Sequence, residues 1–273
     1  MREWVSVRVE RSTNRVAVID ALFCAGSTGV QEDGQDIVTH FPPGTAVEGL
    51  RDSIAIADPG ATIVTGETPQ ADWTAWRAAV RSHQVGGLTI APPWLATDCD
   101  PATTIVIEPA MAFGTGEHPT TRGVIRLMQR VPTVSGLVAD LGAGSAVLSI
   151  AAAKLGASRV AAVELDGDAI GNAEENVLTN GVTDRVRVIE GDAGSVLPLL
   201  APVDLVLANI ISSVLTEMLP AIASAVRSGG HAILSGILLE ERAIMLSAIG
   251  TSDWHVSAED AEGAWWSVLL ERL

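Results

Sequence analysis

Val138-Ala139-Asp140-Leu141-Gly142-Ala143-Gly144-Ser145 is the stretch that decides the fold, because an apolar run ends here in a glycine turn. Residues 146–155 follow with the length and composition of a helix, so we expect a buried strand, a tight turn and a helix. The strand signal then recurs over 159–164, 185–190, 203–208 and 230–235, with helical stretches between. Apolar strands alternating with helices are typical of a parallel, doubly wound α/β sheet.

The glycine turn is also the first candidate binding site. It leaves a strand and enters a helix, which places it at the carboxyl edge of the sheet, where open α/β folds bind ligands. Gly142 and Gly144 allow the backbone to turn sharply and approach a ligand closely. Glu164 lies 20 residues beyond Gly144, at the end of the next expected strand. Its carboxylate can accept hydrogen bonds from both hydroxyls of a ribose.

Two classes of adenosine-containing cofactor fit a glycine turn followed by a distant carboxylate. A dinucleotide site favours G-x-G-x-x-G/A, whereas here the residue three positions after Gly144 is Val147. Asp140 precedes the turn by two positions and would repel a pyrophosphate, yet it suits the ammonium group of S-adenosylmethionine. The charges therefore favour a methyltransferase. Asp192, after the next expected strand, is a candidate partner for the adenine amine, or an ordinary aspartate at a helix start.

The chain is long enough for two domains. Residues 1–68 show short strands and helices that predict a small α+β domain without a chemical motif of its own. We expect a linker over 69–102 and the α/β domain over 103–273.

Composition and charge exclude several classes of function. The formal net charge of −16 argues against direct contact with nucleic acid, because phosphate binding needs a clustered basic surface, and is compatible with a basic protein partner. Cys24 and Cys99 belong to no ligand cluster, so we expect no metal site. An N-terminus without an apolar segment of the signal-peptide type and the lack of a long apolar run predict a cytoplasmic protein that does not cross a membrane.

One segment closely resembles a known family. Glu108-Pro109-Ala110-Met111-Ala112-Phe113-Gly114-Thr115-Gly116-Glu117-His118-Pro119-Thr120-Thr121 is similar to the signature of the ribosomal protein L11 methyltransferase family. Two further matches are Asn209-Ile210-Ile211 after the fourth strand and Ser235-Gly236-Ile237-Leu238. The likeness runs through the α/β half and extends more loosely toward the N-terminus.

The resemblance implies an N-terminal ferredoxin-like domain that recognises the substrate, followed in the sequence by a Rossmann-like class I methyltransferase domain that depends on S-adenosylmethionine. The implied reaction is methylation of amino groups of ribosomal protein L11. By position, Thr121, Gly142, Glu164 and Asn209 would contact the cofactor or line its pocket. Two departures are Glu164, where the family commonly has Asp, and Ala146, in place of a frequent third glycine.

Two segments acquire roles from this comparison and from their own chemistry. Phe113-Gly114-Thr115 belongs to a glycine-rich loop before a helix, which can fold over the sheet edge and exclude water from the sulfonium. Asn209, at the carboxyl end of a strand, can accept a hydrogen from the substrate amine and is our candidate catalytic residue. The alternatives are a simple capping turn for the loop and a pocket wall for the asparagine.

Three functions stay open at this point. The first is methylation of L11, the second is methylation of lysines in another protein, and the third is a non-catalytic module that binds S-adenosylmethionine. An NAD-dependent enzyme is a more distant alternative.

Overall fold

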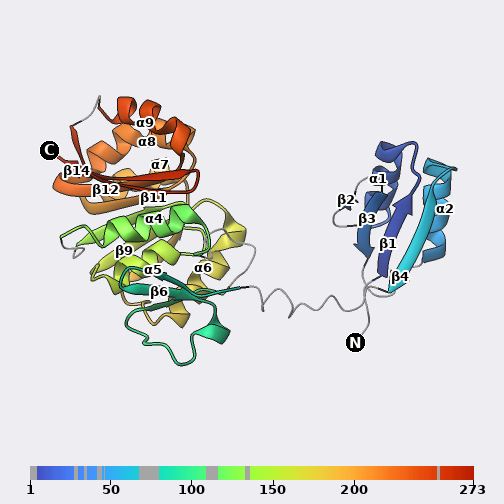
Figure 1. The fold of residues 1–273 in the computed structure, drawn as a ribbon, viewed down its shortest axis with the longest axis horizontal. Helices are drawn as coiled ribbons and strands as arrows, with labels where there is room; N and C mark the ends of the chain where they lie inside the picture. The colour runs from blue at the N-terminus through green and yellow to red at the C-terminus, as the bar shows by residue number, and fades with distance from the viewer. Residues whose placement is uncertain are drawn as a thin grey trace. The chain divides into compact units, whose positions relative to one another are not determined.

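The chain folds into two units, Met1–Val80 and Arg81–Leu273, in a computed structural model (Figure 1). The structure describes residues 5–27, 30–33, 36–41, 45, 47–67, 80–108, 116–132, 136–250 and 253–273. A short helix expected around Asp72 and Trp73 lies outside these residues.

The N-terminal unit is a four-stranded antiparallel sheet with two helices. Its elements follow one another as β1 (Val5–Glu10), α1 (Arg15–Cys24), β2 (Val30–Asp33), β3 (Asp36–Phe41), α2 (Val47–Ala57) and β4 (Thr62–Glu67). The strand order is β2-β3-β1-β4, and every pair is antiparallel. Alternate residues of β1, Val7 and Val9, are fully buried beneath the helices with Leu22 and Ile54. This is the predicted ferredoxin-like α+β arrangement.

The C-terminal unit is built on a seven-stranded sheet in the order β10-β9-β8-β11-β12-β14-β13. Its strands are β8 (Leu137–Leu141), β9 (Arg159–Glu164), β10 (Val186–Glu190), β11 (Val203–Asn209), β12 (Val226–Leu238), β13 (Trp254–Glu262) and β14 (Trp265–Arg272). The first five are parallel, as predicted. The last two form an antiparallel hairpin whose β14 pairs with β12, which the expectation of a wholly parallel sheet missed. Such a hairpin needs only a tight turn and no crossover helix.

Helices cover both faces of this sheet (Figure 1). They are α4 (Pro119–Met128), α5 (Val147–Lys154), α6 (Gly167–Thr179), α7 (Ala193–Leu200), α8 (Ser212–Ala225) and α9 (Arg242–Ile249). One core joins β8 through Val138 to α4, α5 and α6, and the other joins β8 through Ala139 and Leu141 to α7, α8 and α9. The alternation along β8 therefore fixes which helices meet Asp140, because Asp140 shares the face of Val138.

A second, three-stranded sheet lies in the same unit. It comprises β5 (His83–Val85), β6 (Leu88–Ala91) and β7 (Thr104–Val106), with a 3-10 turn, η1 (Pro93–Leu95), after β6. Val85, Leu88 and Ile90 belong to the core that includes α4 and α5. Residues 83–91, which fall in the predicted linker, thus pack with the second unit, while the domain limits themselves stay a prediction.

Within the described residues, none of the helices has the length and apolar character needed to span a bilayer.

Candidate functional site

The glycine turn after β8 is fastened to the neighbouring strand. The N–H groups of Gly142 and Ala143 both donate to the carbonyl oxygen of Val163, at 2.9 and 3.0 Å. Gly142 has a φ of +70°, a left-handed conformation that favours glycine. Because β8 lies between β9 and β11, the turn stands where the chain changes direction across the sheet. Open α/β sheets bind ligands at such a switch point.

Glu164 closes the turn from the end of β9. One carboxylate oxygen accepts the N–H of Gly144 at 2.7 Å, and the other accepts the N–H groups of Leu165 and Asp166, both at 2.9 Å. Three backbone N–H groups therefore hold Glu164, the residue predicted to bind the ribose, beside the glycine turn. A carboxylate offers about four acceptor positions, so room is left for a hydroxyl.

Asp140 is fully buried below the turn. Its Oδ2 atom accepts a 2.6 Å hydrogen bond from the hydroxyl of Ser149 in α5, and its Oδ1 atom has no partner among the described residues. Burial raises the pKa of Asp140 to about 7, the charge of Glu164 also raises it, and the hydrogen bonds from Ser149 lower it. Burying a carboxyl group costs free energy when one of its oxygens has no hydrogen-bond partner, unless a ligand supplies that partner.

Thr121 lies in the first turn of α4 and is also fully buried. Its hydroxyl oxygen has no hydrogen-bond partner within the described chain. Helix α4 packs on the same sheet face as α5, so two orphaned polar atoms, on Thr121 and Asp140, belong to one layer of the unit.

The start of α4 is held by charged and aromatic contacts. His118 caps the helix, its Nδ1 lies 2.6 Å from the hydroxyl of Thr120, and its ring meets Trp265 edge-on at 4.8 Å. Burial, and then the charge of Arg122, lower the pKa of His118. Arg122 contacts the carbonyl oxygens of Gly116 and Glu117 and pairs with Glu262 in β13. The C-terminal hairpin therefore positions the helix that carries Thr121.

Asn209 ends β11, as the sequence predicted. It stands opposite Ser235 of β12, and the following Ile210 donates its N–H to the carbonyl oxygen of Ser235 at 3.1 Å. Gly236, with a φ of +84°, brings β12 so close that a Cβ there would collide with the backbone of Ile210. The two segments that resemble the family, one around Asn209 and one around Gly236, are therefore in contact.

Asp192 is placed as the N-cap of α7. Its Oδ1 atom accepts the N–H and the hydroxyl of Ser195, both at 2.8 Å. This is the ordinary helix-entry role that the sequence left open, and its contact with adenine stays a prediction. Phe113, Gly114 and Thr115 lie outside the described residues.

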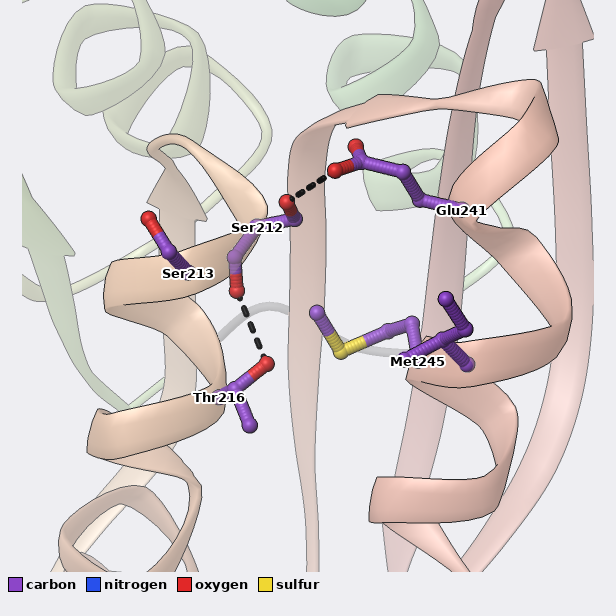
Figure 2. Close-up of a pocket in the computed structure, with 6 residues that line it drawn as sticks. Ser212, Ser213, Thr216, Glu241 and Met245 are labelled. Carbon is purple, nitrogen blue, oxygen red and sulfur yellow. Dashed lines mark hydrogen bonds between the residues drawn. The ribbon is translucent and has the colours of Figure 1, made fainter.

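A small pocket begins three residues after Asn209, between the first turns of α8 and α9 (Figure 2). The Glu241 carboxylate accepts the hydroxyl of Ser212 at 2.6 Å and the N–H of Leu238 at 3.0 Å. Glu241 therefore ties the start of α8 to the end of β12, and none of the predicted site residues lines this pocket. Its lining is Ser212, Ser213, Thr216, Glu241, Ile244 and Met245.

Sequence reasoning missed two features of the cofactor turn. Ser149 is a buried polar residue with apolar neighbours on both sides in α5, which is the one signal that could have indicated its bond to Asp140. Ala146 has a φ of +63° and is fully buried, so the position of a frequent third glycine keeps a left-handed backbone. An L-residue there costs roughly 1–2 kcal/mol, which this chain tolerates.

Comparisons with known proteins agree over nearly the whole chain. The family model described as "Ribosomal protein L11 methyltransferase (PrmA)" matches residues 3–272. A ribosomal protein L11 methyltransferase of Myxococcus xanthus is 35% identical over 242 residues, which cover 86% of this chain and 81% of that one. The protein of the same description from Geobacter sulfurreducens is 34% identical over 276 residues, covering 94% and 89%.

A solved structure is also similar. It is the ribosomal protein L11 methylase of Lactobacillus delbrueckii subsp. bulgaricus, which has 28% sequence identity and a TM-score of 0.63. The match covers 71% of this chain and 99% of that one.

Proposed function

The chain belongs to the ribosomal protein L11 methyltransferase family, and we propose that it methylates amino groups of L11 with Asn209 orienting the acceptor amine. The protein is an S-adenosylmethionine-dependent protein methyltransferase with a Rossmann-like catalytic domain.

The residues at the carboxyl edge of the sheet fit the cofactor. Thr121 and Asp140 each hold one buried oxygen that has no hydrogen-bond partner among the residues the structure describes, which is what a site completed by a polar ligand requires. The turn at Gly142 has the left-handed backbone of a glycine, and Glu164 stands beside it. We assign Asp140 to the ammonium group, Thr121 to the amino-acid end and Glu164 to a ribose hydroxyl.

S-adenosylmethionine supplies a methyl group on a cationic sulfur. Transfer to nitrogen requires the amine lone pair to stand in line with the bond that breaks, so this chain's contribution is mainly positioning and exclusion of water. The acceptor must be neutral, although a free lysine amine has a pKa of about 10.4. A site that buries the amine next to a cationic sulfur lowers that pKa.

Asn209 suits the task of aiming the amine. It ends β11 next to β8, so its backbone stands at the same edge as the cofactor turn. Its amide oxygen can accept one amine hydrogen while a backbone carbonyl accepts another, which directs the lone pair. The observation that supports this placement is the contact of Gly236 with Ile210, which fixes the end of β11.

Charge is compatible with the proposed partner. The net charge of −16 suits a basic protein and disfavours direct binding of nucleic acid. We infer that the ferredoxin-like N-terminal unit recognises the substrate and that the reaction takes place in the cytoplasm, where ribosomal proteins are made.

The test is mass spectrometry of purified L11 incubated with the full chain and labelled S-adenosylmethionine. We expect added methyl groups on lysine side chains, the N-terminal amine or both, and peptide mapping identifies them. Asn209→Ala should lower kcat by about 100-fold, as for loss of one preorganised group at a reacting centre, with cofactor binding retained. Asn172→Ala removes an asparagine amide of α6 whose oxygen accepts a 3.3 Å hydrogen bond from Asn176; it is the control and should leave kcat unchanged.

The same assay separates the alternatives. Methylation of other proteins but not of L11 would assign a different substrate, and binding of the cofactor without any transfer would indicate a binding module. Unchanged methylation and unchanged substrate binding by Asn209→Ala would exclude the proposed role of Asn209.

A further inference from the structure

Asp140 and Ser149 form a buried pair directly beneath the cofactor turn. We propose that Ser149 is a positioning residue that holds Asp140 for the ammonium group of the cofactor, and that binding releases one proton from Asp140 to solvent. This inference rests on the proposed assignment of Asp140 to the ammonium.

The geometry distinguishes the roles of the two carboxylate oxygens of Asp140. Both side chains are 0% exposed, and the Ser149 hydroxyl lies 2.6 Å from Oδ2 of Asp140. Helix α5, which carries Ser149, starts immediately after the glycine turn, so the pair and the turn are one local unit. Since Oδ2 is engaged, Oδ1, for which the described part of the chain provides no partner, is the atom left for a ligand.

The surroundings of Asp140 disfavour its charge unless a cation lies beside it. The facing charge from β9 is Glu164, which repels a second carboxylate. On α5, Lys154 lies in the last turn and donates to the carbonyl oxygen of Pro101. On α4, Arg122 pairs with Glu262 and Arg126 pairs with Asp260. A buried carboxyl group in this setting favours its neutral form, and the pKa of about 7 agrees with it.

The proton balance follows from the two states. In the neutral state Asp140 carries one proton and shares a hydrogen bond with Ser149, whose hydroxyl can donate or accept. When an ammonium group arrives at Oδ1, opposite charge favours the carboxylate, and the proton passes to the buffer. Ser149 then donates to Oδ2, and the ammonium keeps all its own hydrogens.

Calorimetry of the full chain tests the proposal, with S-adenosylhomocysteine as the probe because it carries the same ammonium and does not react. Titrations in two buffers of different ionisation enthalpy give the number of protons released. We expect binding to release most of one proton at pH 6 and a small fraction of one at pH 7.5. The affinity for S-adenosylhomocysteine should be about eightfold weaker at pH 6 than at pH 7.5. Asp140→Asn should abolish the release.

Variants of the serine test its positioning role. Ser149→Ala should weaken binding by about tenfold at pH 7, the cost of one hydrogen bond to a charged group, and move the proton release to higher pH. Ser149→Thr keeps the hydroxyl and should restore the pH at which the proton is released. Ser224→Ala removes another helical serine hydroxyl, bonded to the carbonyl of Pro220, and should change nothing.

The outcomes are distinct. No binding of the probe by the unmodified chain at any pH would refute the cofactor assignment itself. Binding without proton release over this pH range would overturn the proton coupling, and it needs no variant. Equal affinity and equal proton release in Ser149→Ala and the unmodified chain would overturn the role of Ser149.

Discussion

Gly236→Ala is the substitution that most directly tests how the acceptor end of β11 is positioned. The new Cβ would lie 2.8 Å from the carbonyl carbon and 3.0 Å from the nitrogen of Ile210. Carbon atoms pack at about 3.5–4.0 Å, so Ile210, and Asn209 with it, must move by about 1 Å. A displacement of that size at a reacting centre costs on the order of 100-fold in rate. We therefore expect kcat for L11 methylation to fall by about 100-fold.

The matched control is Gly181→Ala, in the turn after α6. Gly181 has a φ of +64°, yet a Cβ there would meet nothing within 4 Å. Both substitutions carry the left-handed penalty of roughly 1–2 kcal/mol, offset by roughly 0.4–1 kcal/mol from a less flexible unfolded chain. The control should thus lose about 1 kcal/mol of unfolding free energy and no activity.

Two measurements decide the comparison. Urea unfolding gives the stability of each variant, and turnover with both substrates saturating gives kcat. A kcat for Gly236→Ala within about threefold of the control would refute the argument that this glycine positions Asn209, because the rate is then insensitive to a 1 Å shift.

Three further predictions concern the residues around the site. Arg126→Gln should cost about 1–3 kcal/mol in urea unfolding, because Arg126 binds Asp260 through two hydrogen bonds and the Asp260 side chain is only 15% exposed. Arg227 pairs with Asp204, and their side chains are 52% and 35% exposed, so Arg227→Gln should cost less than about 1 kcal/mol of unfolding free energy. Equal losses in Arg126→Gln and Arg227→Gln would contradict the argument from burial. Asp140→Asn should stabilise the cofactor-free protein by about 2 kcal/mol at pH 8, since about 4 kcal/mol of burial cost disappears and about 2 kcal/mol returns as unpaired amide hydrogens. The folded-state pKa of about 7 lies above the ordinary 3.8, so the folded state binds more protons between these values and stability falls as pH rises through them. The gain should therefore vanish at about pH 5 and become a loss of about 2 kcal/mol below about pH 4, and a gain that is independent of pH would contradict the assignment. Asp192→Ser keeps a helix cap and should leave Tm within about 2 °C while weakening binding of S-adenosylhomocysteine; unchanged affinity would leave Asp192 with the capping role alone.

The sequence by itself determined the fold class and predicted where the cofactor would bind. The apolar strand that ends at Gly142 and Gly144, with Glu164 at the end of the next strand, indicates the carboxyl edge of a parallel sheet. The sequence can show this because hydrophobic periodicity and the backbone freedom of glycine are local properties. The signature before Thr121 indicated the family, and the comparisons confirm it.

Only the tertiary structure decided how these residues are arranged and which partners they have. The pairing of β14 with β12 and the bond of Ser149 to Asp140 join residues that no local pattern connects. The contact of Gly236 with Ile210 likewise depends on the register of β11 and β12. Charge and hydrogen bonding at a buried atom are set by what the fold brings beside it, so the sequence could predict Asp140 as an acid near the cofactor, but only the packing shows that burial raises its pKa.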